Sequence, residues 1–409
     1  MSKASLVPEK WAIWAQEKNV GDLSIEEVND TETFRSLREP WNTLLRQSSD
    51  NNIFLTWEWL FTWWQHYGRD KKLRIFLIKE SDRIIAIAPF MQWKYHKGIF
   101  NIDVIENLCA IECDYSGIIL TERRQESVAI LLDCLVKITR DSHVIARMFH
   151  IPENSDFISV LREQYPAFSS SLLLIEQPVS TCPYIMLPPT WEEYFHTLSA
   201  KKRKNLRRSM KLLQKDHVVE FKKYAGGEDL RDQLQVLFEL HQKRWQVRNI
   251  RSKFAEPEAR EFYVDVSKAF YQNNWLDFSF LNIDGKPLST SWGFIYNNTY
   301  YDMTGAFDVD YLDLSVGTLH EMKLIESAIQ NGLGKFDFLK GTEAYKSHLT
   351  RSTINNIQIT MAKRNFWGRY HVKLLRILII YDNSRARSLR DNFDLLLKKI
   401  RRQREATDD

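Results

Sequence analysis

A short strand followed directly by charged and phenolic side chains is the first place where this sequence could do chemistry. Residues 335–339 have the pattern of a strand that ends at Gly341, and Glu343, Tyr345 and Lys346 come just after it. Segments beyond strand ends often carry catalytic groups in α/β folds. A carboxylate there could take a proton, a phenol could protonate a leaving group, and a lysine could stabilise an oxyanion. We therefore expect Glu343, Tyr345 and Lys346 to be catalytic, with a solvated polar loop as the alternative.

A second candidate site joins a strand at 300–305 to the start of a helix at about 315–331. Asp302 on the strand is a further candidate base, and N–H groups beside Tyr301 could bind the donor and polarise its carbonyl. The start of a helix offers unpaired N–H groups and the positive end of its dipole, which attract phosphate. Thr318 and Glu321 have the spacing of a capping box. The expected pyrophosphate site consists of Ser315, Val316, Gly317 and Thr318, with an ordinary capped helix as the alternative.

A strongly basic helix is predicted between residues 191 and 215. Seven of the eleven residues from 201 to 211 are Lys or Arg, whereas Leu206, Met210 and Leu213 supply one apolar face. The charges therefore lie outside, where they could bind the phosphates of a nucleotide, CoA, tRNA or a lipid headgroup. A solvated basic surface is the alternative. The substrate-binding candidates on this helix are Arg203, Asn205 and Arg207.

Two smaller groups are further candidates for binding the substrate. His241 is followed by Arg244 and Trp245 on one face of a helix predicted at 230–249. Asp114 and Tyr115 come just before a short strand predicted at 117–120. Local packing is the alternative role for all five side chains.

The composition is that of a folded globular protein. The 409 residues are 44% apolar and 27% charged, with a formal net charge of +4, which excludes a disordered chain. Four cysteines are too few for a disulfide scaffold and fit a reducing compartment. Cys109 and Cys113 lack a second ligand pair at zinc spacing, so we expect buried thiols and no metal. No stretch resembles a secretory signal or a membrane span, which favours a cytoplasmic protein.

Hydrophobic periodicity predicts a first series of elements before residue 140. Trp57, Leu60, Phe61 and Trp64 fall on one face of an aromatic helix, which we expect to pack in the core. The series consists of a strand at 23–29, helices at 31–47 and 53–67, a hairpin of 73–78 and 84–90, strands at 104–109 and 117–120, and a helix at 125–139.

A similar order of elements follows a proline-bearing stretch at 178–190. Asp284-Gly285 is a strong hairpin turn. The predicted elements are helices at 191–215, 230–249 and 256–272, a hairpin of 276–282 and 288–296, a strand at 300–305, a helix at 315–331 and a strand at 335–339. Two copies of one α/β fold would explain this order. We place the domains at 23–177 and 191–365, with an N-terminal extension at 1–22, a linker at 178–190 and a tail at 366–409.

The tail is basic and partly amphipathic. Between residues 366 and 404 there are eleven Lys or Arg and three Asp, a net charge of +8, which leaves about −4 for the rest of the chain. Such a tail could lie on an anionic membrane surface, and peripheral contact at the inner membrane face is one expectation. The alternative is a helix packed on the second domain with a solvated basic side.

Six motifs in one order resemble the CelD-type (cellulose/exopolysaccharide biosynthesis) acetyltransferases of the GNAT superfamily, which are relatives of the FemABX peptidyltransferases. The resemblance covers roughly residues 23 to 360. The first half matches in outline, through W-N-x-L at 41–44 and C-D-Y-S-G at 113–117. The six motifs are S-x-K-x-R-K-N-L-R-R at 199–208, L-H-x-x-R-W at 240–245, D-G-x-P at 284–287, Y-Y-D-M-T-G-A-F-D at 300–308, S-V-G-T-L at 315–319 and D-F-L-K-G-T-E-A-Y-K at 337–346.

The resemblance implies an α/β fold of mixed sheets with two tandem GNAT-like domains, to which this chain adds a basic C-terminal helical tail. It implies that acyl-CoA, as a co-substrate and not a permanently bound cofactor, lies between splayed strands at 300–305 and 335–339. The usual R/Q-x-x-G-x-G/A loop is reduced here to Gly317. The FemABX relatives take aminoacyl-tRNA instead. Lys346 matches their catalytic lysine, and the basic segment at 199–208 matches theirs.

The expected function is that of a bacterial N- or O-acyltransferase. It would move an acyl group, most simply acetyl, from acyl-CoA to an amino or hydroxyl group of a sugar or cell-envelope/polysaccharide precursor. One alternative is a FemX-like transferase that uses aminoacyl-tRNA and a peptidoglycan-type precursor. The other is a non-catalytic module of envelope assembly.

Overall fold

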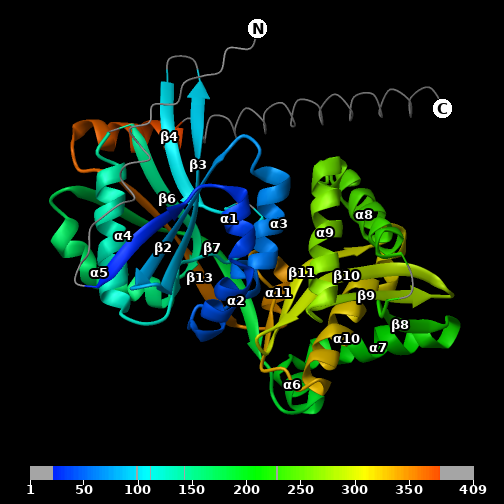
Figure 1. Cartoon of the computed structure of the whole chain (residues 1–409). Helices are drawn as coiled ribbons and strands as arrows, with labels where there is room; N and C mark the ends of the chain where they lie inside the picture. The colour runs from blue at the N-terminus through cyan, green and yellow to red at the C-terminus, as the bar shows by residue number, and fades with distance from the viewer. Residues whose placement is uncertain (1–21, 98–99, 111, 142, 227–228, 378–409) are drawn as a thin grey trace, which may run out of the picture.

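One mixed β-sheet runs through the chain and carries both groups of helices (Figure 1). The structure, a computed structural model, describes residues 22–97, 100–110, 112–141, 143–226 and 229–377. The described strands follow the order β1-β2-β3-β4-β6-β13-β7-β12-β11-β10-β9-β8, and β5 pairs with β3. The mixed α/β class expected from the sequence is confirmed.

The first half builds strands β1 to β7 and the helices between them. The predicted helix at 31–47 is two helices, because Pro40 has no N–H to donate to the Ser36 carbonyl and instead starts a new first turn. The segment after residue 140, for which we predicted no elements, forms β6, α5 and β7. The elements are β1 (Leu23–Val28), α1 (Thr31–Ser36), α2 (Arg38–Gln47), η2 (Ile53–Leu55), α3 (Trp57–Tyr67), β2 (Lys72–Glu80), β3 (Arg83–Lys97), β4 (Phe100–Asn107), β5 (Ile119–Leu120), α4 (Arg124–Ile138), β6 (Val144–Pro152), α5 (Asp156–Phe168) and β7 (Leu172–Met186).

The second half repeats helices, hairpin, strand and helix as expected. Its two tight turns have left-handed backbones, with φ of 51° at Asp284, 78° at Gly285, 46° at Asn297 and 58° at Asn298, as two-residue hairpins require. The predicted helix at 191–215 is again two, since the Ser199 side chain caps a new helix. The elements are α6 (Trp191–Thr197), α7 (Ala200–Asp216), β8 (Val219–Lys223), α8 (Leu230–Gln246), η3 (Lys253–Ala255), α9 (Pro257–Gln272), β9 (Leu276–Ile283), β10 (Lys286–Tyr296), β11 (Thr299–Phe307), η4 (Val309–Leu314), α10 (Val316–Gln330), β12 (Lys335–Asp337), α11 (Ala344–Ser347) and β13 (Ser352–Lys363).

The last strand, β13, lies among the strands of the first half. It is antiparallel to β6 on one side and to β7 on the other, while β7 also pairs with β12. The prediction of a linker at 178–190 is therefore wrong for residues 178–186, because they belong to strand β7 of the sheet. Pro178 is tolerated there because it faces Ile357, where the register of β13 shifts. The division into domains at 23–177 and 191–365 stays a prediction, and the sheet continues across it.

Strands β11 and β12 separate soon after they pair. They run parallel through three residue pairs, of which Tyr301 with Asp337 is the last. Strand β12 ends there, whereas β11 continues to Phe307. Just beyond the split, Asp302 and Met303 both lie opposite Gly293 of β10, so β11 carries a β-bulge. The splayed strands that the resemblance implied are thus present.

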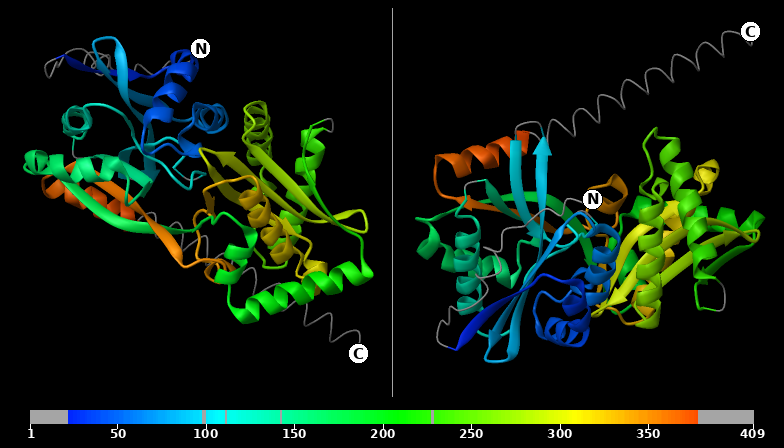
Figure 2. Two further views of the ribbon diagram at one scale, coloured as in Figure 1. Left: turned by 90° about the horizontal axis from the view of Figure 1, so that it is seen from below. Right: turned by 45° about the horizontal axis from the view of Figure 1, so that its top comes forward.

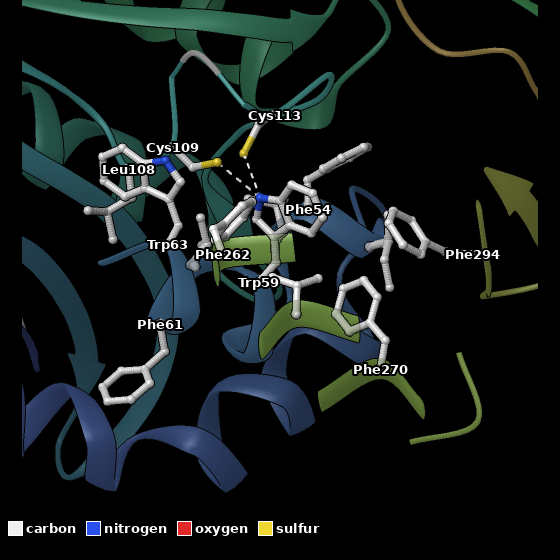
Figure 3. Packing of buried hydrophobic residues seen from close by; sticks show 14 of the residues in the cluster. Phe54, Trp59, Phe61, Trp63, Leu108, Cys109, Cys113, Phe262, Phe270 and Phe294 are labelled. Carbon is white, nitrogen blue, oxygen red and sulfur yellow. Dashed lines mark hydrogen bonds between the residues drawn. The ribbon is translucent and has the colours of Figure 1, made fainter. Parts of the chain in front are cut away.

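The aromatic helix α3 joins the two halves through one apolar core. Trp59 is completely buried, and its ring lies 5.5 Å from that of Phe262 and 5.9 Å from that of Phe270, both on α9 (Figure 3). Its indole N–H points at two sulfur atoms, 3.0 Å from Cys109 Sγ and 3.2 Å from Cys113 Sγ. The predicted core role of this helix and the predicted buried thiols are confirmed. The helix thereby fixes the first half against the second.

The start of the predicted tail is a helix at 366–377. This helix packs on the sheet of the first half. The alternative prediction, a helix packed on the second domain, is therefore wrong for residues 366–377. Residues 378–409 of the tail and 1–21 of the N-terminal extension lie outside the described residues. Among the helices that the structure describes, none is long and apolar enough to cross a membrane. The buried contacts of the helix join Val372 and Leu375 to Ile102, Val104 and Ile145.

Replacing Trp59 with alanine should destabilise both halves together. Removal of a fully buried indole typically costs about 3–5 kcal/mol, and here the cavity would open in a core that belongs to both halves. Urea unfolding followed by circular dichroism should show one transition shifted to lower denaturant. Trp367→Ala is the matched control, because Trp367 is 57% exposed and its loss should change stability by less than about 0.5 kcal/mol. Two separate transitions, with only one shifted, would contradict a shared core.

Candidate active site

A cavity of about 350 Å³ opens beside the far end of β11, against the start of α10. It lies on the second half, on the face of the sheet that packs against α6, α7 and α10, which Figure 1 labels. Strand β10 contributes the hydroxyl side chains of Ser289 and Ser291 to it, and α8 and α7 contribute one cation each. The lining residues are Lys202, Arg244, Ser289, Thr290, Ser291, Asp302, Gly305, Ala306, Phe307, Leu312, Ser315, Val316, Gly317, Thr318, His320, Glu321, Leu324, Tyr345 and Leu349.

The start of α10 forms one wall of the cavity. Ser315 precedes the helix with a left-handed backbone, φ 55°, and no side chain caps the first turn. The N–H groups of that turn therefore stay available to a ligand. A Cβ added to Gly317 would lie 2.8 Å from the Phe307 ring, so glycine is needed for this close approach. All four expected pyrophosphate residues line the cavity, but the capping box predicted from Thr318 is wrong, because Thr318 lies inside the helix.

Two carboxyl groups meet inside the cavity. Asp302 of β11 and Glu321 of α10 are hydrogen-bonded to each other, so the pair must hold a proton. Burial raises the pKa of Asp302 to about 6 and raises the pKa of Glu321 well above its usual range. Ser291 Oγ donates to Asp302 at 3.3 Å. Such a pair can take up or release a proton near neutral pH, which is what a general base or acid requires.

A neutral imidazole lies beside this pair. His320 Nδ1 is 3.0 Å from Ser289 Oγ, and Nε2 is 3.0 Å from Ser279 Oγ. Burial lowers the pKa of His320 to about 3, so the ring is uncharged. One ring nitrogen donates and the other accepts, which fixes the orientation of both hydroxyl groups. His320 thus positions the wall of the cavity.

Two polar atoms at the cavity are removed from solvent and have no hydrogen-bond partner. They are Arg244 Nε and Glu321 Oε1. An unpartnered buried polar group costs about 1–3 kcal/mol, so these atoms favour a ligand that supplies hydrogen bonds. Arg244 is otherwise held by the Gly305 carbonyl at 3.2 Å and by the face of Phe307. The cavity therefore suits a polar and anionic molecule.

The three residues expected to be catalytic after β12 separate into different roles. Tyr345 lines the cavity, and burial raises the pKa of its phenol, which stays protonated. Lys346 is 4% exposed, and its Nζ donates to the carbonyls of Phe338, at 2.9 Å, and Lys340, at 3.3 Å. Glu343 pairs with Lys346 at 2.9 Å from an exposed position. Among the described residues, Tyr345 lines the cavity, whereas Glu343 and Lys346 do not. The charge of Lys346 nevertheless partly offsets the rise that burial causes in the pKa of Asp302, so it lies near the carboxyl pair. A catalytic role for the three residues stays a prediction.

Tyr301 does not line the cavity, contrary to expectation. Neighbouring strand residues point to opposite faces, so Asp302 faces the cavity while Tyr301 enters the core shared with α3. Its ring lies 6.1 Å from that of Phe54. The bulge that follows then turns Thr304 to the same face as Tyr301, where its hydroxyl accepts from Lys253 at 2.9 Å.

The basic helix reaches the cavity through a residue that we did not name. Lys202 lines it, whereas Arg203, Asn205 and Arg207 do not. Arg203 donates to the carbonyls of His196 and Leu198, which joins α7 to the helix before it. Asn205 and Arg207 are exposed on the outer surface. The helical period explains the difference, since only one side of α7 can face the cavity.

The remaining substrate-binding candidates also lie away from the cavity, except Arg244. His241 Nδ1 is 2.8 Å from Ser252 Oγ, its Nε2 accepts from the Trp245 indole at 2.8 Å, and burial lowers its pKa to about 3. These contacts fit a packing role. Asp114 and Tyr115 join the halves. Asp114 accepts from the Lys340 backbone at 3.0 Å, and the Tyr115 hydroxyl donates to Asp337 at 2.9 Å.

Sequence reasoning missed Glu321, His320 and the hydroxyl groups of β10. A signal for the last was present, because Ser289, Thr290 and Ser291 interrupt a strand that is otherwise apolar and buried. The sequence signal for Glu321 and His320 was weaker, because it consists only of two polar residues placed among the apolar residues of a helix. Across the described residues, no group of three or more His, Cys, Asp or Glu is placed to hold a metal ion.

Comparison with known proteins identifies the part of the chain that carries this cavity. Residues 200–347 match a family model described as an acetyltransferase (GNAT) domain. No curated protein sequence matches the chain. These findings and the described topology support a GNAT-type fold for the second half.

Solved structures share the fold at low identity. FemX superposes with a TM-score of 0.56 at 9% identity, covering 78% of this chain and 95% of FemX. A conserved protein of unknown function from Bacteroides thetaiotaomicron gives 0.51 at 13%, covering 82% and 100%. L-PGS from Bacillus licheniformis gives 0.50 at 10%, covering 88% and 98%. At such identities the similarity concerns the fold alone.

The carboxyl pair should make stability fall as pH rises. The pKa of Asp302 is raised in the folded protein, so the native state binds more protons than the unfolded chain between about pH 4 and about pH 6, and stability is lost as pH rises through that window. The two-unit difference corresponds to about 3 kcal/mol. Urea unfolding from pH 4 to pH 7 should show this decline weakened in Asp302→Asn. An identical pH dependence in the variant would exclude a raised pKa at Asp302.

Lys346 and Glu343 should differ sharply when substituted. Lys346→Ala removes a buried ammonium that donates to two carbonyls, and hydrogen bonds to a charged group contribute about 1.5–3 kcal/mol each. Glu343→Gln removes only an exposed ion pair, which contributes less than about 1 kcal/mol. Thermal unfolding should therefore show a large loss for the first variant and almost none for the second. Equal, small losses would contradict a structural role for Lys346.

Proposed function

We propose that this chain, with its GNAT acetyltransferase domain at 200–347, transfers an acyl group from acyl-CoA to an amino or hydroxyl group. The main support for the proposal is that two features of an acyltransferase site lie in the same cavity. An uncapped helix start with Gly317 is suited to pyrophosphate, and a proton-sharing carboxyl pair lies beside the splayed strands. Arg244 and Lys202 add positive charge at the same cavity.

The residues support direct transfer in a ternary complex. The acceptor would attack the thioester carbonyl carbon and lose a proton to Asp302, which is ionised above its pKa of about 6. N–H groups at the bulge of β11 would stabilise the developing oxyanion. The C–S bond then breaks. Tyr345, a protonated phenol at the cavity, would give its proton to the thiolate and recover one from the protonated Asp302, which closes the proton balance.

The acceptor would bind inside the same cavity, because Asp302, which would take its proton, faces the cavity. The opposite face of β11 is filled by the core shared with α3. Ser289 and Ser291 line the cavity from β10 and could bind the hydroxyl groups of an acceptor. A polar acceptor such as a sugar or an envelope precursor fits this lining. We propose that the acceptor belongs to that class, as the resemblance to CelD-type enzymes implies.

A FemX-like use of aminoacyl-tRNA is the second candidate function. FemX shares the fold, and α7 presents an exposed basic surface beside the cavity, through Lys202, that could bind RNA phosphates. The carboxyl pair could also receive the ammonium of an aminoacyl group. The alternative therefore differs in its donor, not in its site.

Calorimetric titration of CoA and acetyl-CoA into the purified chain tests the donor. We expect binding on the order of micromolar for both, in the range typical of enzyme substrates. Gly317→Glu should abolish it, because a carboxylate would occupy the phosphate site and press on Phe307.

The matched control is Gln330→Glu, which makes the same change of charge at the exposed far end of α10. It should bind CoA as the unmodified chain does. No binding at millimolar CoA would reject CoA as the donor and would favour aminoacyl-tRNA. Equal loss in both variants would show that charge, not the helix start, decides binding.

A further inference from the structure

The helix at 366–377 exposes a cluster of aromatic rings on its outer face. Phe366 is 73% exposed, Trp367 57% and Tyr370 41%. The rings touch one another, with centroids 5.5 Å apart for Phe366 and Trp367 and 6.0 Å apart for Trp367 and Tyr370. Ile377 continues the same stripe at helical spacing and is 62% exposed. We call Phe366, Trp367, Tyr370 and Ile377 the outer aromatic face.

The inner face of the same helix is already buried against the sheet. Val372 is 3% exposed and Leu375 is 2% exposed, where they pack on β4 and β6. A surface helix normally turns a polar face to water opposite its buried one. This helix is apolar on both sides, and folding of the described residues uses only one. The outer aromatic face is therefore left for another partner.

The charged residues along the helix that carries the outer aromatic face are all positive. From residue 363 to residue 377 the sequence contains five Lys or Arg and no Asp or Glu. Arg369 and Lys373 lie exposed among the rings. A second copy of the chain would bring these cations against their own equivalents, which opposes self-association. The occupant that fits must be both apolar and anionic.

We propose that the outer aromatic face binds the surface of an anionic lipid bilayer. Trp and Tyr favour the headgroup region, where the ring is buried and its polar edge stays wet. Arg and Lys beside them reach the lipid phosphates while their stems lie along the acyl boundary. The helix lies flat on the sheet of the first half, so the face can contact a membrane without unfolding. Figures 1 and 2 place this helix on the first half, away from α10 and its cavity.

Vesicle flotation of the full chain tests the proposal. We expect the chain to float with vesicles of phosphatidylcholine and phosphatidylglycerol, and much less with phosphatidylcholine alone. The triple variant Phe366→Ser, Trp367→Ser, Tyr370→Ser should lose binding by about tenfold for each ring removed, the factor expected for a large apolar side chain. Arg369→Glu with Lys373→Glu should remove the preference for the anionic vesicles.

The controls separate membrane contact from other causes. Val218→Ser with Val247→Ser removes two apolar side chains that are 72% and 69% exposed on the second half, and it should float like the unmodified chain. The melting temperature of the triple variant should be unchanged, because its rings contribute nothing to the core. Failure of the unmodified chain to float, or flotation of the triple variant at the same level, would overturn the proposal. A dimer that the triple variant abolishes would assign the face to a second copy instead.

Discussion

The shared apolar core around Trp59 is the constraint on which the other parts of the structure depend. It takes an indole from the first half and surrounds it with aromatic rings from α9 and β10, so neither half can complete its core alone. Strand pairing also joins the two halves, because β7 pairs with β12 and β13 lies among the strands of the first half. Strand β11 is thus held rigid from one face by this core. The opposite face is free to carry a cavity.

The candidate chemistry depends on a small irregularity in that strand. Up to Tyr301 the residues of β11 alternate between the two faces, and the bulge at 302–303 then changes the alternation. Asp302 points into the cavity beside Glu321, whereas Thr304 points to the other face beside Lys253. One strand therefore presents a carboxyl group to one side and a hydroxyl group to the other. That arrangement directs the carboxyl group into the cavity, while the hydroxyl group is buried on the face that packs against the shared core.

Sequence reasoning recovered the elements that are governed by local chemistry. The turn at Asp284-Gly285 and the periodic helix α3 are fixed by residue type and spacing. The start of α10 and Asp302 followed from the order of motifs and proved to share a cavity. Tyr301 was misplaced because alternation along a strand does not by itself say which face is covered. The partner of Asp302 could not be found, because Glu321 is nearby only after α10 packs on β10 and β11. Strand β7 was missed because its prolines argue against a central strand, and the irregularity of β13 that accommodates Pro178 is visible only once the two strands pair.

The position of β13 has a consequence for how the protein is made. This strand, 352–363, fills the gap between β6 and β7, although some two hundred residues of chain separate it from β6. A ribosome must therefore have synthesised nearly the whole described chain before the sheet of the first half can close. Until then, β6 and β7 expose unpaired edges with no neighbour to occupy them. Pairing at such sequence distance is slow, so closure of the first-half sheet is a late, long-range step during which those edges are open to pairing with other chains.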